Sequence, residues 1–127
     1  MKSRFAIVAA ASFLLCIAFA SGAFTAIKRG WGSPMVSVSI KNDTKLPVGP
    51  IALRYSSCGV INELTAQRLA PGNDHTFYFM VCGESGYEVS ATLNDGSILS
   101  SGAYVESGYA TLEQIEPTEI RSSYRSY

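Results

Sequence analysis

The sequence predicts an all-β fold, an immunoglobulin-like β-sandwich of about seven antiparallel strands, preceded by one N-terminal hydrophobic helix. Beyond residue 34, apolar residues recur with a period close to two, the period of a strand with one buried face. Gly, Pro, Asn and Asp interrupt these runs about every ten residues, as turns do in sandwiches. The chain has 127 residues, 47% of them apolar, which is enough for one such domain.

The N-terminal segment is the longest apolar run. Residues 5–27 carry no charged side chain, and Lys2 and Arg4 stand just before them. As a helix this run would cover roughly 34 Å, enough to cross a hydrocarbon core of about 30 Å. It also contains Ala-Phe-Ala and Ser-Gly-Ala, small-residue motifs at which signal peptides are cleaved. We therefore predict that residues 1–27 are either a signal peptide or a single transmembrane anchor.

The next segment sets the domain boundary. Residues 28–34 contain two Gly and one Pro, which is typical of a linker. We place the sandwich at 35–120 and a polar C-terminal tail at 121–127. Export through either kind of N-terminal segment locates the sandwich outside the cytoplasm, in the periplasm or cell envelope, tethered or released after cleavage.

The first two predicted strands alternate clearly. At 35–41, Val36, Val38 and Ile40 fall on one face and serines fall on the other. Residues 51–57 alternate in the same way, after a turn that contains Asn, Asp, Gly and two Pro. Each of these strands is therefore expected to bury one face and to expose the other.

The remaining strands follow from turn chemistry. Residues 60–69 contain good helix formers, but we favour a strand because a turn and the aromatic run 75–81 come next. Residues 87–93 and 97–105 flank Asn-Asp-Gly, whose Asp-Gly favours the positive backbone angles of a tight hairpin. Residues 109–115 complete the set of seven.

The cysteines test the compartment. Beyond the N-terminal export segment the chain has an even number of cysteines, Cys58 and Cys82, which predicts one disulfide. A redox motif of the Cys-x-x-Cys type is absent, and a zinc site would need ligands beyond these two and His75. Cys16 lies inside the apolar run, where a lipid-modified cysteine is an alternative. Lipid attachment normally needs a small residue before the cysteine, and Leu15 is large, so we interpret Cys16 as an apolar filler. We expect no metal and no cofactor.

The charge is divided unevenly along the chain. The first thirty residues hold four of the ten bases and no acid, so the remainder has six bases against ten acids. Between Arg68 and Arg121 there are eight acids and no Lys or Arg. The negative charge of this interval would repel the phosphate backbone of a nucleic acid, so we expect no nucleic acid partner. It favours a basic protein partner, although a solvated surface is the simpler alternative.

Catalytic motifs are missing from the sequence. Nucleophilic hydrolysis generally needs a base, and His75, the single histidine, follows a turn at a strand start with no nucleophile elbow nearby. Glycine loops that cradle phosphates are absent too. Carboxylate chemistry would need a cleft that a small sandwich is poorly able to provide. We therefore expect that the protein is not an enzyme.

A short internal repeat indicates the partner-binding surface. Glu-Ser-Gly-Tyr occurs at 84–87 and again at 106–109, each time just before a predicted strand. Tyrosine combines an apolar face with a hydroxyl group and is enriched at binding surfaces. Tyr87 and Tyr109 also fit an alternative in which they begin strands and face the core. The candidate partner-binding residues are Tyr104, Glu106, Tyr109, Glu84 and Tyr87.

The stretch SGAYVESGYATL resembles the SGA-containing loop of periplasmic inhibitors of c-type lysozyme. The resemblance covers residues 101–112 and departs from that family where Ala103 runs straight into Tyr104 without a basic residue. It implies a small exported β-protein that blocks a basic enzyme.

Three function hypotheses follow. The first is a non-enzymatic exported or membrane-anchored sandwich that acts as a protein-binding module in the cell envelope. The second is a periplasmic inhibitor or immunity protein against a basic hydrolase or toxin. The third is a small hydrolase that uses carboxylates, which would need a deep cleft holding two of the acids, and a purely structural envelope component is the further alternative.

Overall fold

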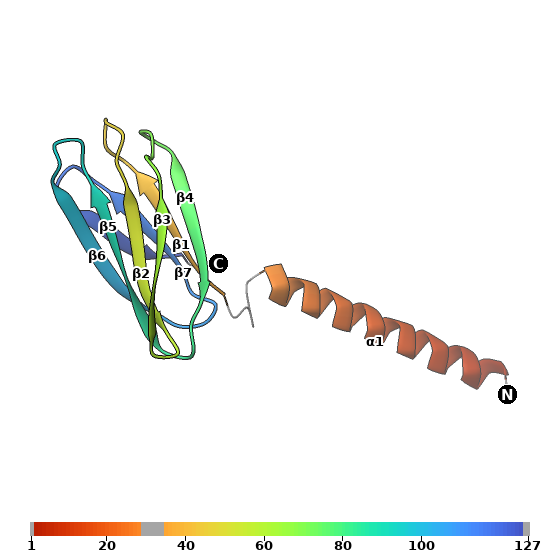
Figure 1. Cartoon of the computed structure of the whole chain (residues 1–127). Coiled ribbons are helices and arrows are strands. Elements are labelled where there is room, and N and C mark those ends of the chain that lie inside the picture. The colour runs from red at the N-terminus through yellow and green to blue at the C-terminus, as the bar shows by residue number, and fades with distance from the viewer. Residues whose placement is uncertain (1, 29–34, 126–127) are drawn as a thin grey trace. The chain divides into compact units, whose positions relative to one another are not determined.

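The computed structural model describes residues 2–28 and 35–125, which fall into two compact units. The first unit holds helix α1, Lys2–Lys28, and the second holds the β-domain (Figure 1). Apart from Lys28, which ends α1, the predicted linker at 28–34 lies outside the described residues.

Helix α1 forms where the sequence is rich in Ala, Leu and Phe and lacks Pro. The hydroxyl groups of Ser21 and Thr25 donate to the carbonyl oxygens four residues earlier, at 2.7 and 2.8 Å. Large apolar side chains are exposed along the helix, with Phe19 at 80%. Over residues 2–28 and 35–125, no helix is long and apolar enough to cross a membrane, the property that the transmembrane-anchor alternative required.

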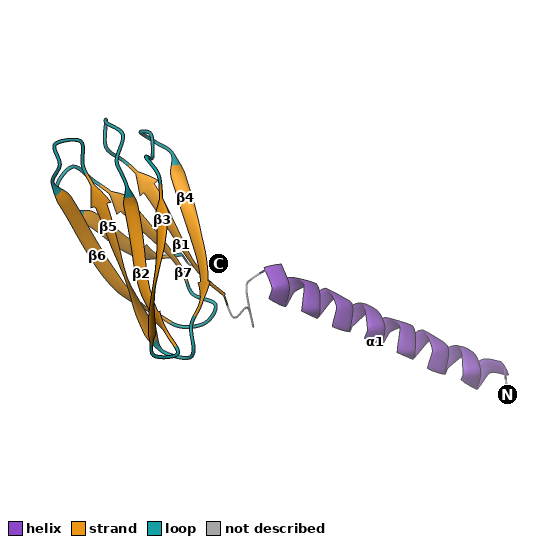
Figure 2. Cartoon of the chain, in the orientation of Figure 1, coloured by secondary structure: helices purple, strands orange, loops and turns teal. Residues whose placement is uncertain are grey.

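The β-domain is a sandwich of two four-stranded sheets, coloured orange in Figure 2. The first sheet has the order β4-β1-β7-β8 and consists of β4 (Asp74–Met80), β1 (Met35–Asn42), β7 (Ala110–Ile115) and β8 (Ile120–Tyr124). The second sheet has the order β3-β2-β5-β6 and consists of β3 (Val60–Ala66), β2 (Ile51–Ser57), β5 (Ser85–Thr92) and β6 (Ile98–Val105). The predicted all-β sandwich is confirmed.

Two details of the sandwich differ from the prediction. An eighth strand, β8, occupies most of the segment expected to be a polar tail. It pairs with β7 at a sheet edge, and all its side chains except Ile120 are exposed, so its sequence lacks the apolar alternation that predicted the other strands. The strands are not all antiparallel, since β1 and β7 run parallel. Alternation of polar and apolar residues assigns faces, but it carries no information about the direction of a neighbouring strand.

The core lies between the inner faces of the two sheets. Val36, Val38 and Ile40 of β1 have no exposed surface, as the alternation predicted. Phe79 of β4 is buried and stacks on Tyr55 of β2, with ring centroids 4.1 Å apart. Fully desolvated aliphatic and aromatic side chains of this kind each contribute about 1.5–3 kcal/mol.

Two hairpins fix the register of the second sheet. Cys58 and Gly59 both have positive φ, 50° and 79°, as the central residues of a two-residue turn between β2 and β3. The predicted Asn-Asp-Gly hairpin joins β5 to β6 and Gly96 has a positive φ of 86°, but Asp95 lacks the expected positive φ, because the strands close at Thr92 and Ile98 around a longer loop. The carboxylate of Asp95 accepts hydrogen bonds from the backbone and hydroxyl groups of Ser97, which lowers the pKa of Asp95.

Candidate functional site

Three tyrosines meet where β6 ends, β7 begins and β8 ends. The ring of Tyr109 contacts Tyr104 and Tyr124 edge to face, at centroid distances of 6.2 and 5.8 Å. The hydroxyl group of Tyr124 donates to the carbonyl oxygen of Tyr104 at 3.0 Å, which fixes the two outer residues relative to each other. We call Tyr104, Tyr109 and Tyr124, together with Glu84 and Glu106, the tyrosine end.

Two acidic side chains accompany these rings. The hydroxyl group of Tyr104 donates to Glu106, and this hydrogen bond, with the nearby charge of Glu84, raises the pKa of Tyr104 above its ordinary value. Neither Glu84 nor Glu106 forms an ion pair with any residue that the structure describes. Tyr104 is 43% exposed and Tyr124 is 60% exposed, so rings and carboxylates share one accessible surface.

Tyr87 does not belong to this surface, which corrects its assignment as a partner-binding residue. Its side chain is only 4% exposed, because it starts the inward-facing row of β5. Its hydroxyl group donates to Glu113 and lies 2.9 Å from the hydroxyl group of Thr111. Burial, and then the hydrogen bond to Glu113, raise the pKa of Tyr87.

The buried Glu113 is the centre of a polar network that the sequence did not reveal. Its second carboxyl oxygen accepts a hydrogen bond from Ser122 at 2.7 Å. Ser122 in turn lies 2.8 Å from the hydroxyl group of Ser101 on β6. The network joins β5 and β6 of one sheet to β7 and β8 of the other, so it closes this side of the sandwich.

The predicted disulfide between Cys58 and Cys82 is confirmed, with the two Cα atoms 5.2 Å apart. It links the β2–β3 turn to the connection in which the chain crosses from β4 to β5. Glu84 follows two residues after Cys82 in that connection. The disulfide therefore restrains one of the segments that build the tyrosine end.

A pocket of about 610 Å³ lies among three other loops and was not predicted from the sequence. Asn42 shapes the first of these loops, because its buried amide donates to the carbonyl oxygens of Leu46 and Leu69 at 2.8 and 2.9 Å. The Leu-Pro-Val run in an otherwise polar turn was the available signal. The pocket is lined by Asp43, Thr44, Lys45, Leu46, Pro47, Val48, Leu93, Asn94, Asp95 and Pro117.

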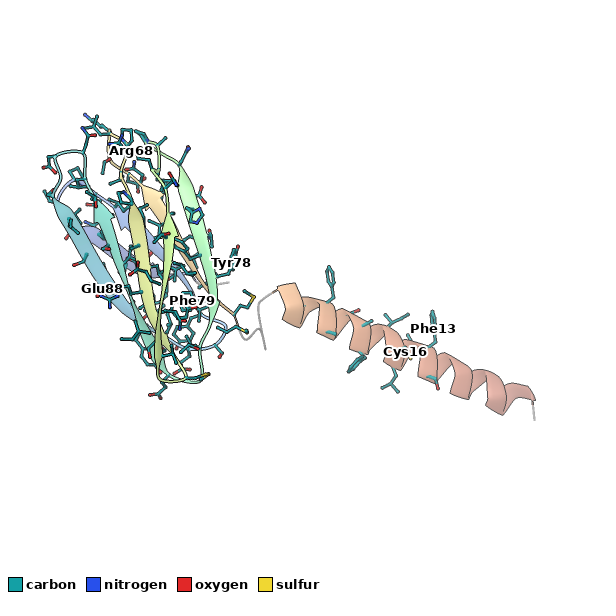
Figure 3. All side chains as sticks on the ribbon, in the orientation of Figure 1. Phe13, Cys16, Arg68, Tyr78, Phe79 and Glu88 are labelled. Carbon is teal, nitrogen blue, oxygen red and sulfur yellow. A yellow bond between two sulfur atoms is a disulfide. The ribbon has the colours of Figure 1, made fainter. Side chains whose placement is uncertain are left out.

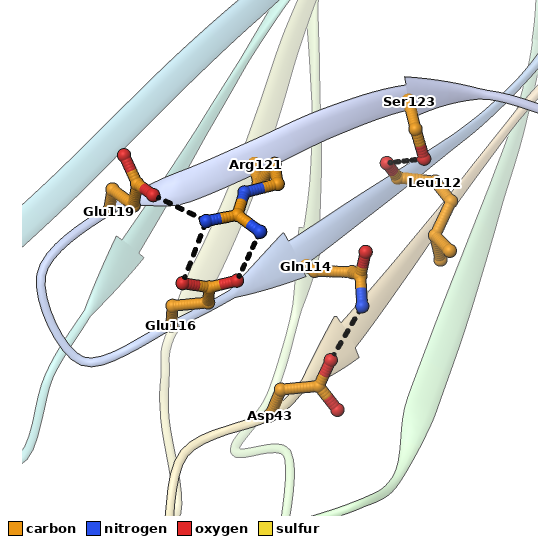
Figure 4. A network of polar contacts seen from close by, with 7 residues as sticks. All are labelled: Asp43, Leu112, Gln114, Glu116, Glu119, Arg121 and Ser123. Carbon is orange, nitrogen blue, oxygen red and sulfur yellow. Dashed lines mark hydrogen bonds and ion pairs between the residues drawn. The ribbon is translucent and has the colours of Figure 1, made fainter.

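The acids of the β7–β8 turn are neutralised, unlike those of the tyrosine end. Figure 4 shows Arg121 between Glu116 and Glu119, at 3.3 and 3.0 Å. Gln114 on the same face donates to Asp43 at 2.8 Å. The interval between Arg68 and Arg121 is therefore less acidic at this turn than a count of residues implies, whereas Glu84 and Glu106 have no ion-pair partner in the part of the chain that the structure describes.

Comparison with known proteins places the fold among solved structures. No family model and no curated protein sequence matches the chain. A protein from Eubacterium rectale, solved by NMR, is similar with a TM-score of 0.50 and 16% identity, over 76% of this chain and 93% of that one. The T6SS lipoprotein TssJ1 from Pseudomonas aeruginosa is similar with a TM-score of 0.50 and 10% identity, over 76% of this chain and 99% of that one. At these identities the likeness concerns the fold.

Proposed function

We propose that this protein is an exported, non-enzymatic β-sandwich that binds another protein in the cell envelope through its tyrosine end. The observation that carries the proposal is the cluster of edge-to-face tyrosines at one end of the sandwich, beside two carboxylates that have no cationic partner among residues 2–28 and 35–125. Of the residues proposed from the sequence, Tyr104, Glu106, Tyr109 and Glu84 belong to this surface.

Export is supported by the charge-free segment at 5–27 and by the disulfide, since disulfides persist in oxidising compartments. A solved structure of similar fold is a lipoprotein of a secretion system, which agrees with an envelope module. The proposed location is therefore the periplasm or cell envelope.

The chemistry of the tyrosine end indicates what it would bind. Tyr104 and Tyr124 offer ring faces and edges that lose little entropy on binding, because a tyrosine side chain has few rotatable bonds. Glu84 and Glu106 attract a cationic side chain, and ring faces hold a cation at about 0.5–1 kcal/mol at exposed sites. The expected partner presents Lys or Arg next to apolar surface.

A pull-down tests the proposal. The full chain, solubilised in a non-ionic detergent, is incubated with envelope extract as wild type and as the double variant Tyr104→Ala with Glu106→Ala. We expect the double variant to recover at least about tenfold less partner than the wild type does, because removing two contact residues weakens the free energy of binding by more than about 1.4 kcal/mol.

The matched control is Ile61→Ala with Glu88→Ala, which removes one exposed apolar and one exposed acidic side chain from the second sheet. It should recover the partner as the wild type does. Equal recovery by both double variants, with both folded, would contradict binding at the tyrosine end.

Inhibition of a basic hydrolase or toxin is the second candidate. The unpaired charges of Glu84 and Glu106 favour it, because such charges speed the encounter with a cationic enzyme. Titration of cationic hydrolases, c-type lysozyme among them, with the purified chain would reveal loss of activity that weakens as salt is raised. Binding without loss of activity would leave the interaction module as the function.

A further inference from the structure

The sandwich has a closed side and an open side. On the closed side, edge strands β6 and β8 are joined by the hydroxyl pair Ser101–Ser122 and by the hydrogen bond from Tyr124 to Tyr104. On the other side, β4 is an edge strand whose partner among the described strands is β1. Figure 1 shows β4 in green along the margin of the domain away from β6.

The register shows which backbone groups of β4 face outwards. Asn42 donates to the carbonyl oxygen of Asn73 at one end of the β1–β4 ladder, so the even-numbered residues of β1 and their odd-numbered partners in β4 are the hydrogen-bonded pairs. Hydrogen-bonded pairs alternate along an antiparallel ladder. The N–H and C=O groups of Thr76, Tyr78 and Met80 therefore point away from β1, where the structure describes no further strand.

This edge lacks the features that normally prevent strands from pairing across molecules. After Asp74, its first residue, β4 contains no Lys, Arg, Asp, Glu or Pro, and its residues are mainly aromatic or β-branched. Two other edges differ, since β3 carries Glu63 and β8 carries Arg121, and the uncharged edge β6 is joined to β8 by side-chain hydrogen bonds. Beside the open edge, Tyr78 and Met80 are 61% and 59% exposed on the outer face, where Figure 3 labels Tyr78.

We propose that β4 is a dimerisation edge, which pairs antiparallel with β4 of a second copy of this chain. Antiparallel self-pairing about a two-fold axis near Tyr78 would set Thr76 opposite Met80 of the second copy, so every outward backbone group gains a partner. It brings no like charges together, because the edge carries none within 75–81. The outcome is one continuous eight-stranded sheet with two-fold symmetry.

The same geometry leaves the tyrosine end accessible, because Tyr104 and Tyr124 lie at the β6–β8 side. A dimer would present two tyrosine ends to a partner. This raises the avidity for any partner with two binding sites without a new contact. The dimer itself does not depend on the proposed function, so the double variant of Tyr104 and Glu106 should remain dimeric.

Thiol cross-linking tests the dimer. The full chain with Cys16→Ala and Tyr78→Cys, in a non-ionic detergent, is treated with a short bifunctional maleimide. We expect a covalent dimer as the main product. The matched variant with Ser123→Cys, on the outer face of the remote strand β8, should remain monomeric. A Tyr78→Cys chain that is no more cross-linked than this control overturns the proposal.

A charged side chain placed on β4 tests the dimer without thiol chemistry. Tyr78→Lys puts like charges opposite each other at the two-fold axis, and we expect sedimentation to show at least about a tenfold weaker dimer. Ser123→Lys should leave the dimer unchanged. A wild type that is monomeric at its solubility limit, or a dimer that survives Tyr78→Lys, overturns the proposal. So does a monomer that pairs β4 with a strand of an unrelated protein.

Discussion

Tyr87 and Tyr109 end the two copies of the same four-residue sequence, yet the structure uses them differently. Tyr87 lies within β5 on an inward-facing position and is buried. Tyr109 precedes β7 and is half-buried between two other rings. The sequence could not separate the two cases, because the identical motif leaves open where each strand begins and a shift of one residue changes the face.

The buried hydroxyl group of Tyr87 leads to a stability prediction. Tyr87→Phe removes the donor to Glu113 and leaves that carboxyl oxygen buried without this hydrogen bond. We expect the free energy of unfolding to fall by about 1–3 kcal/mol, measured by urea denaturation. Tyr55→Phe removes a hydroxyl group that has no hydrogen-bond partner among the residues that the structure describes, and it should lower the free energy of unfolding by less than about 0.5 kcal/mol. Equal losses for the two variants would contradict the network.

Because the pKa of Tyr87 is raised, the difference in stability between wild type and Tyr87→Phe depends on pH. In the unfolded chain a tyrosine ionises near pH 10, whereas burial and Glu113 keep the folded Tyr87 protonated to higher pH. The stabilisation by Tyr87 is therefore complete below about pH 10 and is lost as the pH rises further. The stability advantage of wild type over Tyr87→Phe should shrink above this pH.

At the scale of elements, the sequence predicted seven strands because each buries one face and ends at turn residues. Strand β8 was not predicted because its side chains beyond Ile120 are exposed and show no apolar alternation. Its pairing with β7, which a local sequence pattern does not reveal, stabilises it. The parallel contact between β1 and β7 is a property of the whole chain path, so a local pattern could not reveal it.

The contact between β5 and β6 makes Gly102 sensitive to substitution. A Cβ atom at Gly102 would lie 2.9 Å from the carbonyl oxygen of Tyr87, which is backbone and cannot move away cheaply. We expect Gly102→Ala to lower the free energy of unfolding by about 1–3 kcal/mol in thermal or urea unfolding.

Gly86 is the matched control on the paired strand. Its added Cβ would meet the nearest atom, the carbonyl oxygen of Ala103, at an ordinary contact distance of 3.5 Å. Gly86→Ala should therefore be nearly neutral, because the loss of chain entropy in the unfolded state offsets small adjustments. A Gly102→Ala variant as stable as Gly86→Ala would contradict the described pairing of β5 and β6.

At the scale of the whole molecule, the sequence predicted the end of the sandwich that carries Glu84, Tyr104, Glu106 and Tyr109. It did so because turns between successive strands of a sandwich gather at its two ends. It did not predict Tyr124, because the polar sequence of β8 is typical of a tail, and it did not predict the pocket, whose walls come from three loops far apart in the chain. A site whose residues come from several loops can be recognised only when the fold is known, because the fold brings those residues together.

The disulfide connects the stability of the molecule to its compartment. The bond between Cys58 and Cys82 closes a 25-residue loop, with a sequence separation of 24. Chain-entropy arithmetic assigns such a loop about 3.5 kcal/mol, a large share of the net stability of a small domain. A domain built in this way is suited to oxidising surroundings, where the bond is maintained.

The most direct test of export is the redox state of the two cysteines in the cell. Intact cells that express the chain are quenched in acid, and the denatured protein is alkylated before and after reduction and analysed by intact mass. Export predicts that Cys58 and Cys82 are protected from alkylation until a reductant is added. Full alkylation of both thiols without reductant would contradict an oxidising location and, with it, the account of this protein as an exported module.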